Sequence, residues 1–200
     1  MIVQRFVPAL ALLLMPGCNS QQPAPTDPAA SGEATEIASP QASEDAASAA
    51  SLVSRYTSLK NCKLDEEGNG EDWSVSRCPG LGGFSLVLNY GDARDDLALR
   101  QTGRKDAEIG LPYLAGGGFN ALGETIEWRG SESGGGFEPT GLIVRNNAVQ
   151  DPEHPEKPTS LLVVIDLSQG CAVAQLKPGT GQNERARAVA DGPRQPCLRN

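Results

Sequence analysis

Residues 160–176, SLLVVIDLSQGCAVAQL, indicate the fold more clearly than any other stretch of the 200-residue chain. Residues 160–167 form the most apolar run after the first 18 residues, and a run of this length is typical of a buried strand. Ser168, Gln169 and Gly170 predict a turn into a second strand at 171–176. We therefore expect a central strand, an antiparallel partner and a mainly β fold.

A second hairpin is predicted at the start of the same domain. Residues 59–64 and 73–78 flank an acidic segment that contains Gly68-Asn69-Gly70. Asn-Gly between two short strands is a strong hairpin signal. If a three-residue loop centres on Gly70, Cys62 lies directly opposite Cys78, and side chains in opposed positions are close enough to form a disulfide.

Alternating apolar residues and glycine turns extend the β pattern along the chain. Gly116-Gly117-Gly118-Phe119 recurs eighteen residues later at 134–137, and each copy precedes a predicted strand. Two copies with so short a period do not indicate a repeat array. They indicate two neighbouring strands, each of which follows a similar glycine turn. Further strands are predicted at 84–90, 96–101, 124–129 and 140–146.

A helix is predicted at each end of the domain. Residues 44–57 begin with acids and alanines, and Leu52, Val53 and Tyr56 then fall on one helical face. Residues 181–190 form the second predicted helix, which ends before a Gly-Pro pair. The expected fold has about seven short antiparallel strands, arranged as a sandwich or a partly open barrel, with a peripheral helix at each end.

The five cysteines indicate an oxidising compartment. Four of them lie in the predicted domain, and four thiols most simply form two disulfides. We expect the pairs Cys62–Cys78 and Cys171–Cys197. A four-cysteine metal site is the competing interpretation, but zinc ligands usually come in closely spaced pairs, and these spacings are 16 and 26 residues. No metal or cofactor is expected.

The first 18 residues predict export from the cytoplasm. An apolar run at 6–15 follows Arg5, and it is too short to cross a bilayer, which takes roughly 20 apolar residues. Gly17 stands directly before Cys18, so the segment resembles the lipobox of bacterial lipoproteins, with Met15 where leucine is usual. The resemblance implies cleavage before Cys18 and acylation of that cysteine. An ordinary secretory signal is the alternative.

The layout after Cys18 also resembles that of small, disulfide-bearing envelope lipoproteins of proteobacteria, a group without a characterised function. Residues 18–50 are rich in Ala, Ser, Pro and acids, which predicts a disordered tether, and residues 51–200 form the expected domain. A flexible linker of about 30 residues spans roughly 30 Å. Asn19 after the cysteine implies sorting to the outer membrane, with the domain in the periplasm or outside the cell.

Charge excludes one class of partner. The net charge is −8, and loss of residues 1–17 removes only one base, which leaves 16 bases, 25 acids and a charge of −9. Nucleic-acid binding requires clustered bases, so we do not expect a nucleic-acid partner. The expected partners are the membrane, through the lipid anchor, and an envelope protein or a cell-wall component.

Few residues carry a catalytic signal. His154, the only histidine, lies between prolines and acids in a predicted loop, where we expect it to be solvated. Trp73 and Trp128 are expected in strands, and either could line a shallow groove for a sugar or a peptide. Seven carboxylates lie on or near predicted strands: Asp95, Asp96, Glu124, Glu127, Glu132, Glu138 and Asp166.

Two function classes remain open at this stage. We prefer a non-enzymatic binding or assembly module held on a membrane, and inhibition of an attacking hydrolase such as lysozyme is one specific form of that function. The alternative is a cell-wall or glycan hydrolase, which would need two carboxyl groups about 5–10 Å apart in a cleft.

Overall fold

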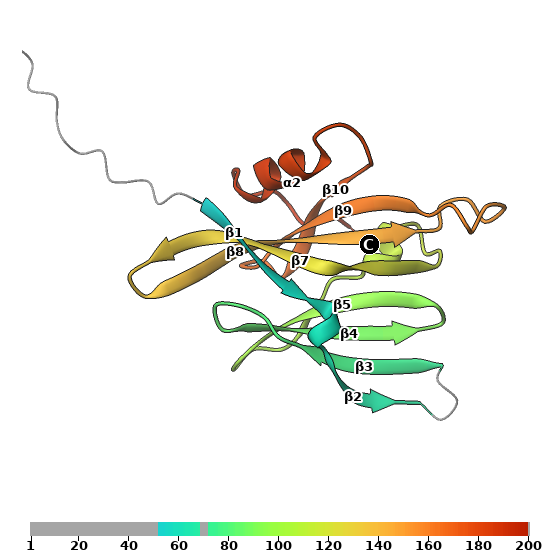
Figure 1. Ribbon diagram of the computed structural model, residues 1–200, viewed down its shortest axis with the longest axis horizontal. Helices are drawn as coiled ribbons and strands as arrows, with labels where there is room; N and C mark the ends of the chain where they lie inside the picture. Colours follow the sequence, from blue (N-terminus) through green and yellow to red (C-terminus); the bar gives the residue numbers. More distant parts are fainter. Residues whose placement is uncertain (1–51, 69–71, 200) are drawn as a thin grey trace, which may run out of the picture. The chain divides into compact units, whose positions relative to one another are not determined.

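The computed structural model describes residues 52–68 and 72–199, which belong to one compact unit. The predicted signal, Cys18, the predicted tether and residues 44–51 of the predicted first helix lie outside the described residues. In the described ranges no helix is both long and apolar enough to cross a membrane. The described fold is mainly β (Figure 1).

The elements follow one another with short connections. In chain order they are β1 (Leu52–Ser58), the 3-10 helix η1 (Leu59–Asn61), β2 (Lys63–Glu67), β3 (Trp73–Cys78), β4 (Phe84–Gly91), β5 (Arg94–Gln101), β6 (Ala107–Glu108), α1 (Leu111–Leu114), β7 (Asn120–Ser133), β8 (Gly136–Ala148), β9 (Thr159–Asp166), β10 (Cys171–Leu176) and α2 (Gln182–Ala190).

The ten strands in the described part of the chain belong to one mixed sheet, which does not close into a barrel. Its main path runs β10-β9-β8-β7-β5-β4-β3-β2, with β1 paired to β7 and β6 paired to β5. Every pairing is antiparallel except the contact between β5 and β7, a parallel bridge at Arg94 and Asn120. The mainly β class is therefore confirmed. The prediction of about seven strands is wrong in number, and the prediction that all of them are antiparallel missed the parallel contact between β5 and β7.

Two halves of the sheet face each other across the main core. Strands β2–β5 form one half and β7–β10 the other, and α2 covers the far face of the second half (Figure 1). Leu86 and Leu97 from the first half share one buried cluster with Trp128 and Ile165 from the second. Because only one backbone bridge joins β5 to β7, apolar side chains supply most of the contact between the halves.

Both expected disulfides form. Lys63 pairs with Arg77 across β2 and β3, so Cys62 lies opposite Cys78, and the two Cα atoms are 4.0 Å apart. The second disulfide, Cys171–Cys197, has a Cα separation of 5.8 Å and fastens the C-terminal segment to β10. The central-strand prediction for 160–167 is confirmed as well, because β9 is paired on both edges.

The predicted helix over 44–57 is wrong where the structure describes it. Residues 52–57 lie in β1, which pairs with β7 from Leu52 opposite Ser131 to Ser58 opposite Thr125. The apolar face of the predicted helix is not buried, since Leu52 and Tyr56 are 38% and 55% exposed. Pairing with a distant strand outweighs the local helical pattern.

The other boundaries differ in smaller ways. The predicted strand at 59–64 is split into η1 and the start of β2, whereas the predicted helix at 181–190 is confirmed as α2. The two repeat copies lead into much longer strands, β7 and β8, which pair with each other and place Ile126 directly opposite Val144.

Candidate functional site

The connection between β6 and β7 presents two aromatic rings to solvent. This aromatic loop, residues 110–119, contains α1 and three consecutive glycines. Gly116 and Gly117 have φ angles of 91° and 78°, a region that favours glycine, so the chain turns sharply there. Tyr113 is 71% exposed and Phe119 is 50% exposed, although rings of this size are usually buried in a small domain.

Buried and half-buried polar side chains hold the root of the aromatic loop. Asp96 on β5 accepts hydrogen bonds from the N–H groups of Gly110, at 3.2 Å, and Leu111, at 2.9 Å. Asn146 on β8, which is fully buried, donates to the Leu111 carbonyl at 3.2 Å. Asn120 donates to the Asn146 side-chain oxygen at 2.9 Å. The loop is thus fixed from both halves of the sheet.

Two consecutive carboxylates of β5, Asp96 at the root of the loop and Asp95 on the opposite face of the strand, are half-buried. Burial raises the pKa of Asp96 above its usual value, even though N–H groups of Leu111, Leu97 and Gly110 donate to it and act in the opposite direction. Burial likewise raises the pKa of Asp95, against a hydrogen bond from the Leu122 N–H group. Polar groups buried at such cost fix the conformation of the segment that they contact.

One groove lies on the outer face of the sheet beside the loop. It encloses about 510 Å³, and we call it the sheet groove. Asn89 pairs with Asp96, and Gly91 pairs with Arg94, so these four residues share the face opposite the core and line the groove. The remaining lining residues are Tyr90, Pro112, Tyr113 and Gly117.

Trp73 lies on β3, next to the strands under the sheet groove, but its indole ring lies over Gly68 on the β2 side and does not line the groove. It pairs with Gly91 across β3 and β4, which places it on the same outer face, and it is 44% exposed. The position of a Cβ atom on Gly91 would lie 3.7 Å from the Trp73 Cβ. Of the two tryptophans, only Trp73 is available to a ligand, because Trp128 is fully buried and donates to the Thr57 hydroxyl at 2.9 Å.

Arg94 connects the sheet groove with a second, more apolar groove. The second groove encloses about 640 Å³ between the aromatic loop and residues 149–155, and Phe119, Pro152 and Pro155 line it. The Arg94 guanidinium lies 5.5 Å from the centre of the Phe119 ring, donates to the Gly117 carbonyl at 3.2 Å and forms an ion pair with Asp92. We call the exposed set Trp73, Arg94, Tyr113 and Phe119 the aromatic surface.

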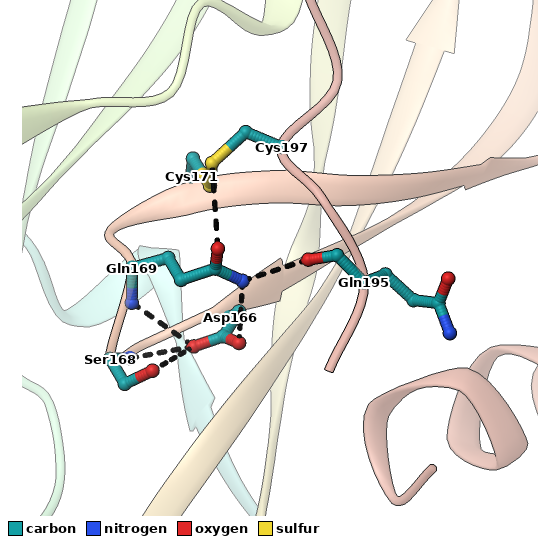
Figure 2. Close-up of a disulfide and its surroundings, with 6 residues drawn as sticks. All are labelled: Asp166, Ser168, Gln169, Cys171, Gln195 and Cys197. Atoms are coloured by element: carbon teal, nitrogen blue, oxygen red, sulfur yellow. Dashed lines mark hydrogen bonds between the residues drawn. A yellow bond between two sulfur atoms is a disulfide. The ribbon is translucent and has the colours of Figure 1, made fainter. Parts of the chain in front are cut away.

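Asp166, a predicted strand carboxylate, has a structural role at the second disulfide (Figure 2). Its Oδ1 accepts hydrogen bonds from the Ser168 N–H at 2.8 Å and hydroxyl at 2.7 Å, and its Oδ2 accepts from the Gln169 amide at 2.8 Å. The same amide donates to the Gln195 carbonyl at 2.9 Å. Burial acts to raise the pKa of Asp166, but these hydrogen bonds together lower it, so Asp166 stays ionised and ties the turn to the C-terminal segment.

The other carboxylates predicted as catalytic candidates also have partners. Glu127 pairs with Arg187 and Glu124 with Lys60. Glu132 pairs with Arg55, and Glu138 accepts a hydrogen bond from Ser133 at 3.3 Å. Asp95 and Asp96 are consecutive in β5 and therefore project to opposite faces. The structure does not bring two of these groups together across a cleft in the part of the chain that it describes.

His154 lies in the loop between β8 and β9, as predicted. Its Nδ1 is 3.5 Å from a carboxylate oxygen of Glu156, and its side chain is mostly exposed. Within residues 52–68 and 72–199 no group of three or more His, Cys, Asp or Glu side chains is arranged to hold a metal ion.

Sequence reasoning missed most of this surface. It identified Trp73 as a candidate groove residue and the glycine run as a turn, but Arg94, Tyr113 and Phe119 carried no recognised motif. A signal was present, since two aromatic rings flank three glycines in a segment outside the predicted strands. No protein-family model, curated protein or solved structure matches this chain. Its function therefore has to be inferred from the surface itself.

Proposed function

We propose that this protein is a lipid-anchored, non-enzymatic binding module of the bacterial cell envelope, and that the aromatic surface contacts its partner. The observation that carries this proposal is the aromatic loop, which is fixed by buried polar side chains and yet presents Tyr113 and Phe119 to solvent. Exposed apolar patches on a small domain mark binding sites more often than chance exposure.

The composition of the aromatic surface supports a binding role. Tyrosine, tryptophan, phenylalanine and arginine are enriched in recognition surfaces, where rigid rings provide large contact areas at little entropic cost. Arg94 stacks near Phe119 and bonds to the loop backbone, so the surface is ordered before a ligand arrives. A preformed surface loses less conformational entropy on binding than a mobile one.

The alternative, a hydrolase with paired carboxylates, has less support. Such an enzyme needs one carboxyl group as an acid and another as a base or nucleophile on the two sides of a substrate. The candidate carboxylates instead accept backbone hydrogen bonds or pair with arginine and lysine, as Glu127 does with Arg187 at 2.6 Å. These contacts favour structural roles for the acidic side chains.

The placement of the module rests on the N-terminal sequence. Cleavage before Cys18 and acylation of that cysteine would attach the domain to a membrane, and Asn19 favours the outer membrane. The tether would let the domain reach about 30 Å from the bilayer, toward cell-wall material or another envelope protein.

Photo-crosslinking in intact cells tests the proposed function. A photoreactive phenylalanine analogue replaces Tyr113 in the full chain, and Tyr56 on β1, which is also exposed, is the matched control position. We expect discrete adducts from position 113 that disappear in the Phe119→Ser background and are absent from position 56. Equal adducts at both positions, or none at 113, would refute the aromatic surface as the binding site.

A cell-wall digestion assay separates the specific forms of the function. Addition of the purified protein to lysozyme should slow digestion if the protein is an inhibitor, and Tyr113→Ala should restore the rate. Digestion of the wall by the protein alone would overturn the binding proposal in favour of the hydrolase.

A further inference from the structure

We propose that the disulfide Cys171–Cys197 is a redox-sensitive latch. While it is closed, it fastens the C-terminal segment, residues 193–199, beside β10. Reduction by a dithiol releases this segment and uncovers the edge of β10, whereas Cys62–Cys78 reacts far more slowly. The inference does not rest on the proposed binding function, because it involves none of the residues of the aromatic surface.

The two disulfides differ in their access to solvent. Cys78 is 2% exposed and belongs to the main core cluster, against which Cys62 packs. Cys197, by contrast, is exposed, as are all of residues 191–199. Thiol–disulfide exchange begins when a thiolate reaches one of the two sulfur atoms. A reductant can therefore attack Cys197 in the folded protein, while the packing of the core shields the first disulfide.

Few other contacts hold the C-terminal segment in place. In the described part of the chain, the Leu198 N–H group donates to the Ala172 carbonyl at 2.8 Å. The Gln169 amide donates to the Gln195 carbonyl at 2.9 Å (Figure 2). Two of the seven residues of the segment are prolines, which have no N–H group to donate. Ordering seven residues costs more conformational free energy than two hydrogen bonds return, so the segment is released once the disulfide opens.

The C-terminal segment lies along an edge of the sheet that is prone to pairing. β10 stands at one end of the main strand path, and its sequence CAVAQL contains no charged side chain. An uncharged edge of this kind is a template for pairing with another chain, and the Leu198 N–H group occupies one of its backbone acceptors. β2, at the other end of the path, carries four charged side chains, which oppose such pairing. Charge thus protects one end of the sheet, and the latched segment protects the other.

The proposed reduction is a two-step exchange. A thiolate of the dithiol attacks the Cys197 Sγ, the bond between the two sulfur atoms breaks, and Cys171 leaves as a thiolate that takes up a proton. The second sulfur of the reductant then attacks the mixed disulfide and releases Cys197, which is protonated in turn. The reductant is oxidised to a disulfide, and the two protons that it loses are those that the cysteines gain. In the cell envelope, a dithiol oxidoreductase is the class of enzyme that supplies this reaction.

Differential alkylation of the full-length protein in detergent measures the selectivity of the reaction. Dithiothreitol, a small dithiol, is added without denaturant, N-ethylmaleimide blocks the free thiols at successive times, and peptide mass spectrometry identifies the blocked cysteines. We expect Cys171 and Cys197 to be labelled at least about tenfold faster than Cys62 and Cys78. Equal rates, or faster labelling of the first disulfide, would overturn the inference.

Limited digestion with trypsin measures the release of the segment. The double variant Cys171→Ser, Cys197→Ser gives the released state without a reductant, so the disulfides of trypsin stay intact. Arg194 lies within the segment, and Arg104, exposed in the loop between β5 and β6, is the matched cleavage site outside it. Cleavage after Arg194 should be at least about tenfold faster in the double variant than in the oxidised wild type, whereas cleavage after Arg104 should be unchanged.

A second variant separates the disulfide from the hydrogen bonds. Gln169→Ala removes the donor to the Gln195 carbonyl but keeps the disulfide, and cleavage after Arg194 should stay within about twofold of the wild-type rate. Acceleration as large as that of the double variant would show that hydrogen bonds hold the segment, and unchanged cleavage in the double variant would show that the disulfide does not. Equal acceleration at Arg194 and Arg104 would assign the disulfide to the stability of the whole domain. Each of these three results would refute the latch.

Discussion

Asp96→Ala removes the acceptor that fixes the root of the aromatic loop. The N–H groups of Gly110 and Leu111 then lose their partner, and Leu111 is fully buried, so water does not readily replace the carboxylate. Each unsatisfied buried donor lowers the free energy of unfolding by about 1–3 kcal/mol. Removal of the carboxylate offsets part of this loss, because its desolvation in the folded state no longer costs free energy. We expect the free energy of unfolding to fall by about 2–4 kcal/mol.

The pH dependence of the Asp96→Asn variant tests the same contact by an independent route. Burial raises the pKa of Asp96 above 3.8, so the folded protein binds this proton more tightly than the unfolded chain does. The resulting stabilisation is fully present below 3.8 and is lost as the pH rises through the raised pKa. Asparagine does not titrate there. The stability of the wild type relative to Asp96→Asn should therefore increase as the pH falls from neutral toward 3.8.

Urea denaturation and amide hydrogen exchange measure these effects. Exchange should accelerate first at the amides of residues 110–117 in Asp96→Ala, because the loop loses its anchor before the sheet opens. Glu66→Ala, at an exposed position of β2, is the control and should change stability by less than about 0.5 kcal/mol. If Asp96→Ala is as stable as this control, or if exchange accelerates evenly over the sheet, the anchoring role of Asp96 is refuted.

Three further predictions concern other parts of the chain. Replacement of both Cys171 and Cys197, which are 26 residues apart, by alanine should lower the free energy of unfolding by about 3–4 kcal/mol in a denaturant titration; no loss would contradict the chain-entropy estimate. Arg129→Met leaves Asp191 without the partner that it holds at 2.5 Å, and a loss of about 2–3 kcal/mol in the same titration should follow, whereas an unchanged midpoint would show that the pair is dispensable. Cys18→Ser should move the protein from the membrane fraction to an unprocessed or soluble form in cell fractionation, and unchanged membrane retention would argue against acylation.

The local part of the fold was predictable from the sequence. Asn69-Gly70 between short strands indicated a hairpin, and Cys62 does lie opposite Cys78. The predicted three-residue loop is wrong, because Gly68 bonds to Trp73 and Glu67 pairs with Ser74, and a register shift between Leu64 and Glu66 brings the cysteines opposite each other. The turn at 168–170 was predictable as well. In each of these cases the residues that interact lie close together in the chain.

The distant contacts were not predictable by this reasoning. Leu52, Val53 and Tyr56 fit a helical face as well as a strand, and only the pairing of β1 with β7 decides between the two. The anchoring role of Asp96 depends on Leu111, 15 residues away, and on a loop path that propensity does not encode. For the candidate site, the sequence indicated glycine turns and Trp73, while the exposure of Tyr113 follows from the tertiary structure alone.

The pairing of β1 with β7 affects the order in which the chain can fold. Ser54 and Glu127, which bond across these strands, are separated by 73 residues, and Thr57 and Trp128 by 71. The hairpins β2–β3 and β4–β5 need only neighbouring sequence and can close early. β1 has no partner strand until residues 125–131 have been synthesised and have reached the same compartment.

During that interval β1 is an unpaired strand, a state prone to association with other chains. Arg55 in its centre interrupts the run of apolar and β-branched side chains, and such a charge opposes aggregation of a waiting strand. When β1 pairs with β7, Thr57 accepts the hydrogen bond of the buried Trp128. β1 therefore makes this contact with the core late, although it is synthesised before β7.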